Sequence, residues 1–186
     1  MVLSEEQLAL LPTEEDVAFY EAHGWYVSPK IIPDEVFEVA KLGAERFYRG
    51  ERDAEWPYTS GFSVSNPEHP NAIRNDQYVA FRIQELRYLA LQPVIGAIAA
   101  RLARTTEIRL LDDALVYKPP QSKGVVGWHV DRAYWGNCTS DNMLTAWIPF
   151  HDVDESHGPL MVCDRSHRWR GMEHSRQFNN QDIDGV

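Results

Sequence analysis

The sequence predicts a single α+β domain in which helices come first and strands follow. Amphipathic stretches with helix caps occupy about residues 1–107, and β-branched and aromatic runs occupy about residues 108–186. No linker separates the two halves, and 186 residues suffice for one domain. Helices segregated from strands pack on one face of a sheet, and short strands in series are typical of a distorted jelly roll.

Two helices are expected in the first fifty residues. Thr13 is a suitable N-cap, with Asp16 three residues later, and Gly24 is a suitable stop signal. We expect Asp34 to cap a second helix that ends near Tyr48, because apolar residues recur along one side of this stretch.

A long loop and a third helix complete the helical half. Residues 51–75 contain four prolines or glycines among polar residues and are expected to form a loop, of the kind that often covers a site. The third helix is expected to start near Pro93 and to run to Leu102, with Ile95 and Ile98 on its apolar side.

Three strand-like runs follow. The first lies within 108–117, the second is 143–150 and the third is 160–163. A glycine-containing loop joins the first run to the second, and a turn at 155–159 joins the second to the third. This order predicts a small β-barrel that presents a site at its mouth.

The stretch Gly127-Trp128-His129-Val130-Asp131 carries the clearest chemistry. Alternation along a strand sends His129 and Asp131 to the same face, close enough to hold one ion. They would be two ligands of a 2-His-1-carboxylate triad, which holds Fe(II) with open positions. An isolated motif of this kind also occurs in solvated turns. Its place between strand-like runs favours a metal site.

Composition excludes several classes of protein. The net charge of −10 argues against nonspecific nucleic-acid binding, which needs a basic surface. Two cysteines without a C-x-x-C pattern favour a reducing compartment, so we expect a cytoplasmic protein. The sequence lacks an apolar run long enough to span a membrane, and its start lacks the pattern of a signal peptide.

From about Glu14 to His167 the chain resembles the phytanoyl-CoA dioxygenase-type Fe(II)/2-oxoglutarate oxygenases. The matching residues are Tyr117-Lys118-Pro119-Pro120, Trp128-His129-Val130-Asp131, Trp147, Asp152, His157-Gly158-Pro159-Leu160-Met161-Val162 and Arg165-Ser166-His167-Arg168, together with the opening stretch Phe19-Tyr20-Glu21-Ala22-His23-Gly24-Trp25-Tyr26-Val27. Two departures stand out: His157 replaces the usual Asn, and Asp164-Arg165 replaces a Pro-Gly pair.

The resemblance implies a double-stranded β-helix, which is a cupin-like jelly roll, with helices against one side. It implies Fe(II) and 2-oxoglutarate as cofactor and cosubstrate, O₂ as co-reactant, and hydroxylation of an aliphatic C–H bond in a lipid-like or natural-product small molecule. Succinate and CO₂ would be released. The residues expected at the cosubstrate are Trp147, Thr145, Tyr117 and Lys118, and those expected at the substrate are Arg132, Tyr134 and Trp135.

The third iron ligand is the gap in this assignment. The resemblance places the second histidine and a 2-oxoglutarate-binding arginine several strands after the His167 turn. We therefore expect both beyond Val186, and we expect 1–186 to be one oxygenase domain that lacks its C-terminal strands. His174 follows Asp131 by 43 residues and is the weaker candidate, because a polar loop residue is the better interpretation of it.

Two other functions are compatible with parts of the sequence. A non-catalytic cupin-like ligand-binding barrel, or a degenerate family member, would explain the absence of a third ligand. A zinc hydrolase normally needs three protein ligands, and the chain has no His-Glu-x-x-His pattern, so this alternative is disfavoured.

Overall fold

The computed structural model describes residues 3–55, 73–140, 142–172, 174–180 and 182–183. Its helices and strands, in chain order, are α1 Glu5–Ala9, α2 Glu14–His23, α3 Asp34–Tyr48, β1 Arg74–Gln77, α4 Gln84–Ala90, α5 Pro93–Leu102 and β2 Ala114–Tyr117. Four 3₁₀ turns accompany them: η1 Val79–Phe81, η2 Asp131–Ala133, η3 Glu155–His157 and η4 Ser166–Arg168.

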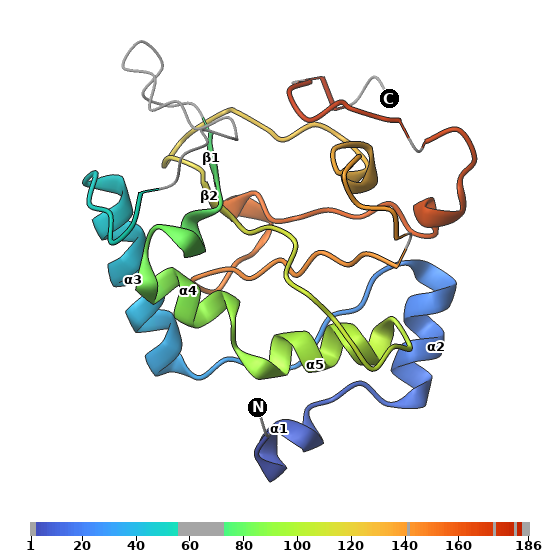
Figure 1. Ribbon diagram of the computed structural model, residues 1–186. Helices are drawn as coiled ribbons and strands as arrows, with labels where there is room; N and C mark the ends of the chain where they lie inside the picture. The colour runs from blue at the N-terminus through green and yellow to red at the C-terminus, as the bar shows by residue number, and fades with distance from the viewer. Residues whose placement is uncertain (1–2, 56–72, 141, 173, 181, 184–186) are drawn as a thin grey trace.

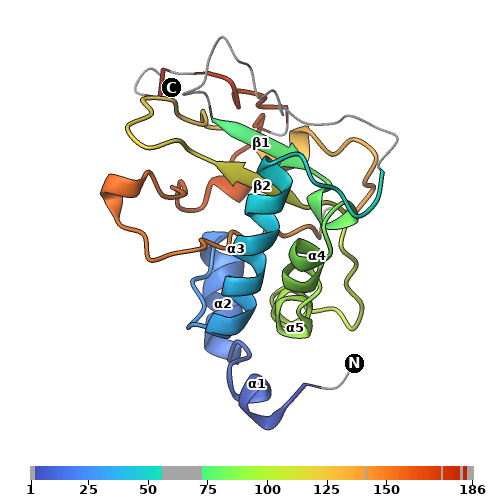
Figure 2. The same cartoon turned by 90° about the vertical axis from the view of Figure 1, so that its left-hand side faces the viewer.

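The molecule has a helical layer on one side, and a small sheet with irregular segments on the other (Figures 1 and 2). Helix α3 packs against α4, and α2 packs against α5. The buried apolar core lies mainly within this layer and is formed by Val17, Ile32, Val36, Ala40, Phe47, Val79, Ile83, Leu86, Leu89, Val94, Ile98, Leu102 and Leu115. Burial of these apolar side chains stabilises the packing of the helices.

The three predicted helices are confirmed. Thr13 and Asp16 form a capping box at the start of α2, and Gly24 ends it with a φ of 84°. Helix α5 begins with Pro93, whose fixed φ suits the first helical turn. The prediction that Asp34 caps α3 is wrong: Pro33 is the N-cap, and Asp34 is the first helical residue.

Two short helices were not predicted. Helix α1 has only five residues, although Ser4 and Gln7 form a capping box at its start. Helix α4 has no side-chain cap, because its N-cap is Ile83. Helices this short depend on packing rather than on local propensity, so the sequence pattern was too weak to indicate them.

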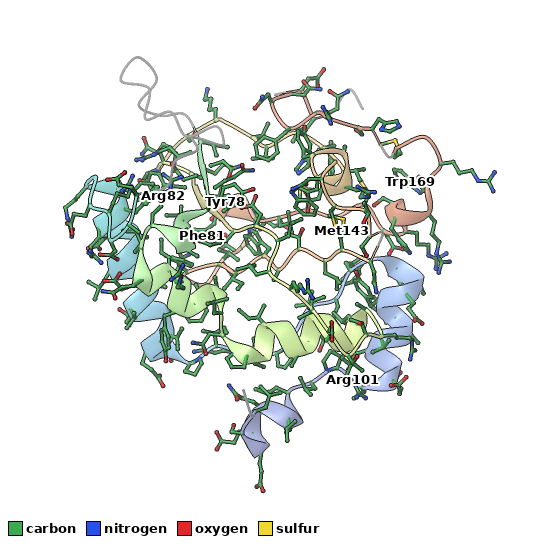
Figure 3. All side chains as sticks on the ribbon, viewed as in Figure 1. Tyr78, Phe81, Arg82, Arg101, Met143 and Trp169 are labelled. Carbon is green, nitrogen blue, oxygen red and sulfur yellow. The ribbon has the colours of Figure 1, made fainter. Side chains whose placement is uncertain are left out.

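Strands β1 and β2 form a two-stranded antiparallel sheet, which pairs Arg74 with Tyr117 and Gln77 with Ala114. Strand β2 lies within the first predicted strand-like run, whereas β1 begins inside the predicted loop 51–75. The expected lid over the site falls mostly on 56–72 and lies outside the described residues. Beside β1, the rings of Tyr78 and Phe81 lie 6.2 Å apart (Figure 3).

The predicted strands at 143–150 and 160–163 are wrong for the described residues. Neither segment has regular secondary structure there, and among the described residues their only backbone hydrogen bond is the local one from the Ser166 N–H to the Cys163 carbonyl. Trp147, Leu160, Met161 and Val162 are each at least 45% exposed. A β-rich composition favours an extended backbone, but a strand needs a neighbour to pair with. The described residues are therefore a mixed helical and small-sheet structure, and the double-stranded β-helix stays a prediction.

A partly buried carboxyl group lies where β2 meets η1. Asp113 accepts a hydrogen bond from the Ala80 backbone N–H at 2.9 Å through one oxygen, and its other oxygen is buried with no hydrogen-bond partner among the described residues. Burial raises the pKa of Asp113 to about 6, and the neighbouring Asp112 adds to the shift.

We expect stability to fall as the pH rises from about 4 to about 6, because the folded protein holds a proton on Asp113 that the unfolded chain releases. The shift from 3.8 to about 6 corresponds to roughly 3 kcal/mol. Urea unfolding of the wild type and of Asp113→Asn across this range tests it. The variant should lose this part of the pH dependence; equal slopes in the two proteins would contradict the expectation.

Candidate metal centre

His129 and Asp131 lie side by side in the structure. His129 Nε2 is 3.1 Å from Asp131 Oδ1, and the side chains are 19% and 42% exposed. His129 Nδ1 is 2.8 Å from the Gly127 carbonyl oxygen. A carbonyl oxygen only accepts hydrogen bonds, so we assign a proton to Nδ1. The other ring nitrogen, Nε2, is the usual point of metal attachment and faces Asp131.

The backbone explains this arrangement, although not through a regular strand. Val130 is extended, with φ −112° and ψ 119°, and Asp131 begins the 3₁₀ turn η2. One extended residue between the two side chains is enough to bring both to the same side. The structure thus places the pair together as the spacing predicts, at the start of a turn rather than at the mouth of a barrel.

Thr145 holds the other oxygen of the carboxylate. Its hydroxyl donates a hydrogen bond of 2.5 Å to Asp131 Oδ2. Asp131 Oδ1 therefore faces His129. Both atoms that could bind an ion, His129 Nε2 and Asp131 Oδ1, are held in place by hydrogen bonds that the same side chains make with Gly127 and Thr145. Outer partners of this kind orient metal ligands in proteins.

The electrostatics favour a charged aspartate. Burial raises the pKa of Asp131, but hydrogen bonds from His129 and Thr145 outweigh this effect and hold the pKa below its ordinary value. The hydrogen bond with Asp131 raises the pKa of His129, with a smaller contribution from Gly127, while burial opposes the shift. Both ring nitrogens of His129 face acceptors. A bound cation would replace the Nε2 proton.

Two aromatic rings cover His129. The ring centroid of Phe178 lies 4.9 Å away and that of Tyr134 lies 5.9 Å away. The Gly127 N–H donates to the Phe178 carbonyl at 2.9 Å, and the Val130 N–H donates to the Ser175 carbonyl at 3.2 Å. Residues 175–180 therefore lie along the backbone that carries the pair.

The residues present fit two positions of a six-coordinate ion. Neighbouring ligands of an octahedral ion with bonds of about 2.0–2.2 Å lie about 2.8–3.1 Å apart. The observed Nε2–Oδ1 distance of 3.1 Å lies in this range. Neutral imidazole and carboxylate are also the ligand types of non-haem Fe(II) sites. Among the described residues, however, no three His, Cys, Asp or Glu side chains gather closely enough to hold a metal ion.

Of the residues expected at the cosubstrate, Thr145 contacts the pair directly through its hydroxyl. Trp147 is 45% exposed, and Tyr117 is 41% exposed with its ring 5.4 Å from that of Tyr48. The Lys118 amine lies against Gly158, where any larger residue would collide with it.

The residues expected at the substrate follow the pair in η2 and the next turn. Arg132 donates from Nη1 to the Trp135 carbonyl at 3.2 Å. Tyr134 lies beside His129, and its hydroxyl accepts a hydrogen bond from the Phe178 N–H at 3.2 Å. Arg176 stabilises the same turn, because its Nε donates to the Ala133 carbonyl at 2.8 Å.

His174 lies in an exposed turn just before Ser175. It forms no three-residue metal group with His129 and Asp131. Its role as a substitute ligand stays a weak hypothesis.

The turn η4 and the residues before it dock on the end of α2. Asp164 accepts hydrogen bonds from His23 Nδ1 at 2.7 Å and from Trp25 Nε1 at 3.0 Å. His167 lies against Gly24 and contacts the Glu21 carbonyl at 3.2 Å. Trp169 lies at the periphery beside this turn and is 51% exposed (Figure 3). Asp164, which departs from the family's Pro-Gly pair, is thus a docking residue in this chain.

Sequence reasoning missed Phe178 and the segment around it, because packing between residues about fifty positions apart leaves no local pattern. One signal was present. Gly127 is buried, and a side chain there would collide with the backbone oxygens of Gln177 and Asn180. A glycine beside a strand-like run is typical of close backbone approach.

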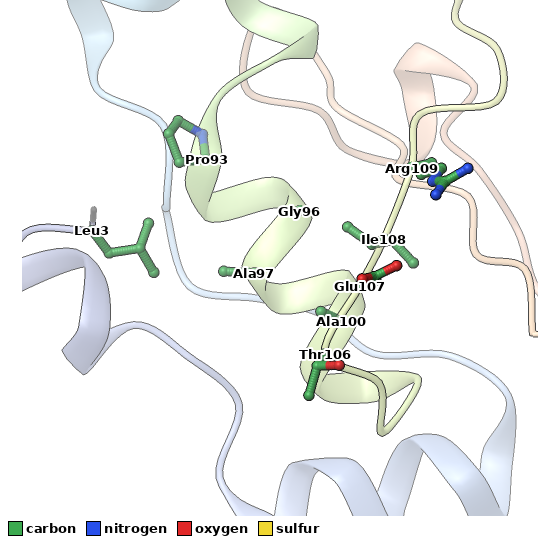
Figure 4. Close-up of a pocket in the computed structure, with 9 residues that line it drawn as sticks. All are labelled: Leu3, Pro93, Gly96, Ala97, Ala100, Thr106, Glu107, Ile108 and Arg109. Atoms are coloured by element: carbon green, nitrogen blue, oxygen red, sulfur yellow. The ribbon is translucent and has the colours of Figure 1, made fainter. Parts of the chain in front are cut away.

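A separate hollow of about 690 Å³ lies along α5 (Figure 4). Its lining comes from Leu3, Pro93, Gly96, Ala97, Ala100, Thr106, Glu107, Ile108 and Arg109. His129 and Asp131 are not among these residues, so this hollow does not belong to the metal pair.

The described residues thus combine a mixed helical and small-sheet structure with one histidine and one carboxylate held 3.1 Å apart, two ligand types that non-haem iron proteins use. Residues 20–185 match the family model described as phytanoyl-CoA dioxygenase (PhyH). The chain belongs to this family, whose members are typically 2-oxoglutarate-dependent dioxygenases. Searches of curated proteins and of solved structures returned no match. Within the described residues, every helix is too short or too polar to cross a membrane.

Proposed function

We propose that the protein is an Fe(II)- and 2-oxoglutarate-dependent oxygenase that hydroxylates an aliphatic C–H bond of a lipid-like or natural-product small molecule. One substrate C–H bond, 2-oxoglutarate and O₂ would give the alcohol, succinate and CO₂. The observation that carries the proposal is the His129–Asp131 pair, with an Nε2–Oδ1 distance of 3.1 Å, in a chain of the PhyH family.

In this proposal His129 Nε2 and Asp131 Oδ1 hold the iron. Bound Fe(II) would supply the redox chemistry that couples decarboxylation of 2-oxoglutarate to substrate oxidation. Gly127 keeps the metal-binding tautomer of His129, and Thr145 keeps Asp131 oriented through its second oxygen. Phe178 and Tyr134 exclude water from the histidine, which strengthens its electrostatic interactions.

The cosubstrate and the substrate are assigned to two different sets of residues around the pair. We assign 2-oxoglutarate to Thr145, Trp147, Tyr117 and Lys118, of which the lysine supplies a positive charge for a carboxylate. We assign the substrate to Arg132, Tyr134 and Trp135, because these residues directly follow Asp131. The large exposed fraction of Trp147 supports this assignment, since a packed core residue would be covered.

The proposal also requires a third protein ligand and an arginine for 2-oxoglutarate, and we assign neither to a described residue. A cytoplasmic location is part of the same proposal, and both cysteines, Cys138 and Cys163, are free thiols. The alternative is a non-catalytic cupin-like binder, which the lack of a three-ligand group among the described residues favours.

Succinate formation by the natural protein separates the two functions. The protein would be supplied with Fe(II), O₂, 2-oxoglutarate and a panel of lipid-like and natural-product compounds. An oxygenase forms succinate only when iron is present and forms more with its substrate. An iron-loaded protein that forms none with any compound would favour the binder.

A further inference from the structure

Two histidines outside the His129–Asp131 pair lie close together on the surface. The ring centroids of His151 and His157 are 5.4 Å apart. Both side chains are exposed, His157 to 46%. His157 belongs to the turn η3, where it replaces the Asn that is usual in the family. Neither histidine has a part in the proposed oxygenase site.

Both rings are held in the tautomer that binds metals through Nε2. His151 Nδ1 lies 2.7 Å from the Asp152 carbonyl oxygen, which can only accept a hydrogen bond. His157 Nδ1 lies 2.8 Å from Asp154 Oδ1. The Asp154 N–H is also 3.2 Å from this nitrogen, but a carboxylate would repel an unprotonated nitrogen at 2.8 Å. We therefore assign the proton to Nδ1 in both rings. Neither Nε2 has a hydrogen-bond partner among the described residues.

The separation of the rings suits one shared ion. Imidazole nitrogen binds Zn²⁺ at about 2.0–2.1 Å, which puts each ring centroid about 3.2 Å from the ion. Two such rings at a tetrahedral angle have centroids about 5.2 Å apart, close to the observed 5.4 Å. Histidines that bind metal usually donate their other N–H to a carbonyl or a carboxylate, as both do here.

The local charge also favours a cation. Three acidic residues lie between the two histidines in the sequence: Asp152, Asp154 and Glu155. Asp154 Oδ1 accepts hydrogen bonds from the Ser156 N–H at 2.8 Å and from the Ser156 hydroxyl at 2.6 Å, which hold this carboxylate beside His157. The Lys118 amine against Gly158 is an opposing charge close to His157.

We infer that His151 and His157 form a second metal site, in which their two Nε2 atoms bind one imidazole-preferring divalent cation such as Zn²⁺, with water at the remaining positions. Asp154 is its positioning residue, because it orients the His157 ring. The site is independent of the proposed oxygenase function.

The test is calorimetric titration of Zn²⁺ into Asp131→Ala protein, in which the first pair is disabled. We expect one Zn²⁺ per chain to bind. Adding His151→Ala or His157→Asn should weaken binding more than about tenfold, whereas His174→Ala, another exposed histidine, should leave it unchanged. Asp154→Asn should give a smaller loss. Equal binding with and without His151 and His157, or no Zn²⁺ binding to Asp131→Ala protein, would overturn the inference.

A second readout does not depend on how the variants fold. In the unsubstituted protein, Zn²⁺ should shift the imidazole NMR signals of His151 and His157 together, at the same metal concentration. Shifts of His129 alone, with His151 and His157 unchanged, would equally overturn the second site.

Discussion

Asp131→Ala is expected to abolish Fe(II)-dependent succinate formation and to lower iron affinity strongly. The substitution removes one of two fixed donor atoms together with the negative charge that favours the cation. It also leaves His129 Nε2 without its acceptor. Loss of a direct ligand should cost more than the roughly 10- to 100-fold that loss of an outer partner typically costs. Anaerobic iron titration and a succinate assay measure the two effects.

Two further variants are compared with Asp131→Ala: one removes an outer partner of Asp131, and the other is a surface control. Thr145→Val keeps the size of the side chain but removes the 2.5 Å hydrogen bond to Asp131 Oδ2, so it should lower iron affinity by about 10- to 100-fold. Asp34→Ala removes a surface carboxylate at the start of α3 and should change neither quantity. An Asp131→Ala protein that turns over like Asp34→Ala would remove the assignment of Asp131.

Gly127→Ala is expected to displace residues 175–180 and to destabilise the fold. The new Cβ would lie 2.6 Å from the Asn180 carbonyl oxygen and closer still to that of Gln177. Both are backbone atoms, which cannot rotate away as a flexible side chain would. Overpacking typically lowers the free energy of unfolding by about 1–3 kcal/mol. Here it would also disturb the hydrogen bond from the Gly127 N–H to the Phe178 carbonyl. Thermal unfolding measures the loss of stability.

The matched control is Gly136→Ala, because a Cβ at Gly136 would meet no atom within 4 Å. Limited proteolysis should cut near residues 175–180 faster in Gly127→Ala than in Gly136→Ala, since the displaced segment is open to the protease. If Gly127→Ala and Gly136→Ala had the same unfolding temperature and the same cleavage rate, residues 175–180 would not be in close contact with Gly127.

The helical half could be predicted because its signals are local. Capping residues such as Thr13 and Asp16, the stop at Gly24 and the proline at the start of α5 are read within a few positions. The two short helices were not predicted: α1 has only five residues despite its capping box, and α4 begins without a side-chain cap. Strand β1 was missed because it depends on pairing with β2, forty residues later in the sequence.

The contact between His129 and Asp131 could be predicted because only one residue separates them. The reason differed from the prediction: an extended Val130 followed by a 3₁₀ turn brings the side chains together, without a paired strand. The surroundings of the pair, above all Phe178, depend on contacts between distant segments. The expected strands at 143–150 and 160–163 were inferred from composition, which cannot supply the partner that a strand requires.

The most direct test of the metal centre is the visible charge-transfer absorption that Fe(II) gives with chelated 2-oxoglutarate, measured without oxygen in the natural protein. We expect this absorption in the wild type and in His174→Ala. We expect none in His129→Ala or Asp131→Ala, because each lacks one of the two fixed donors. Absorption that survives in His129→Ala, or that disappears in His174→Ala, would contradict the assignment of the His129–Asp131 pair.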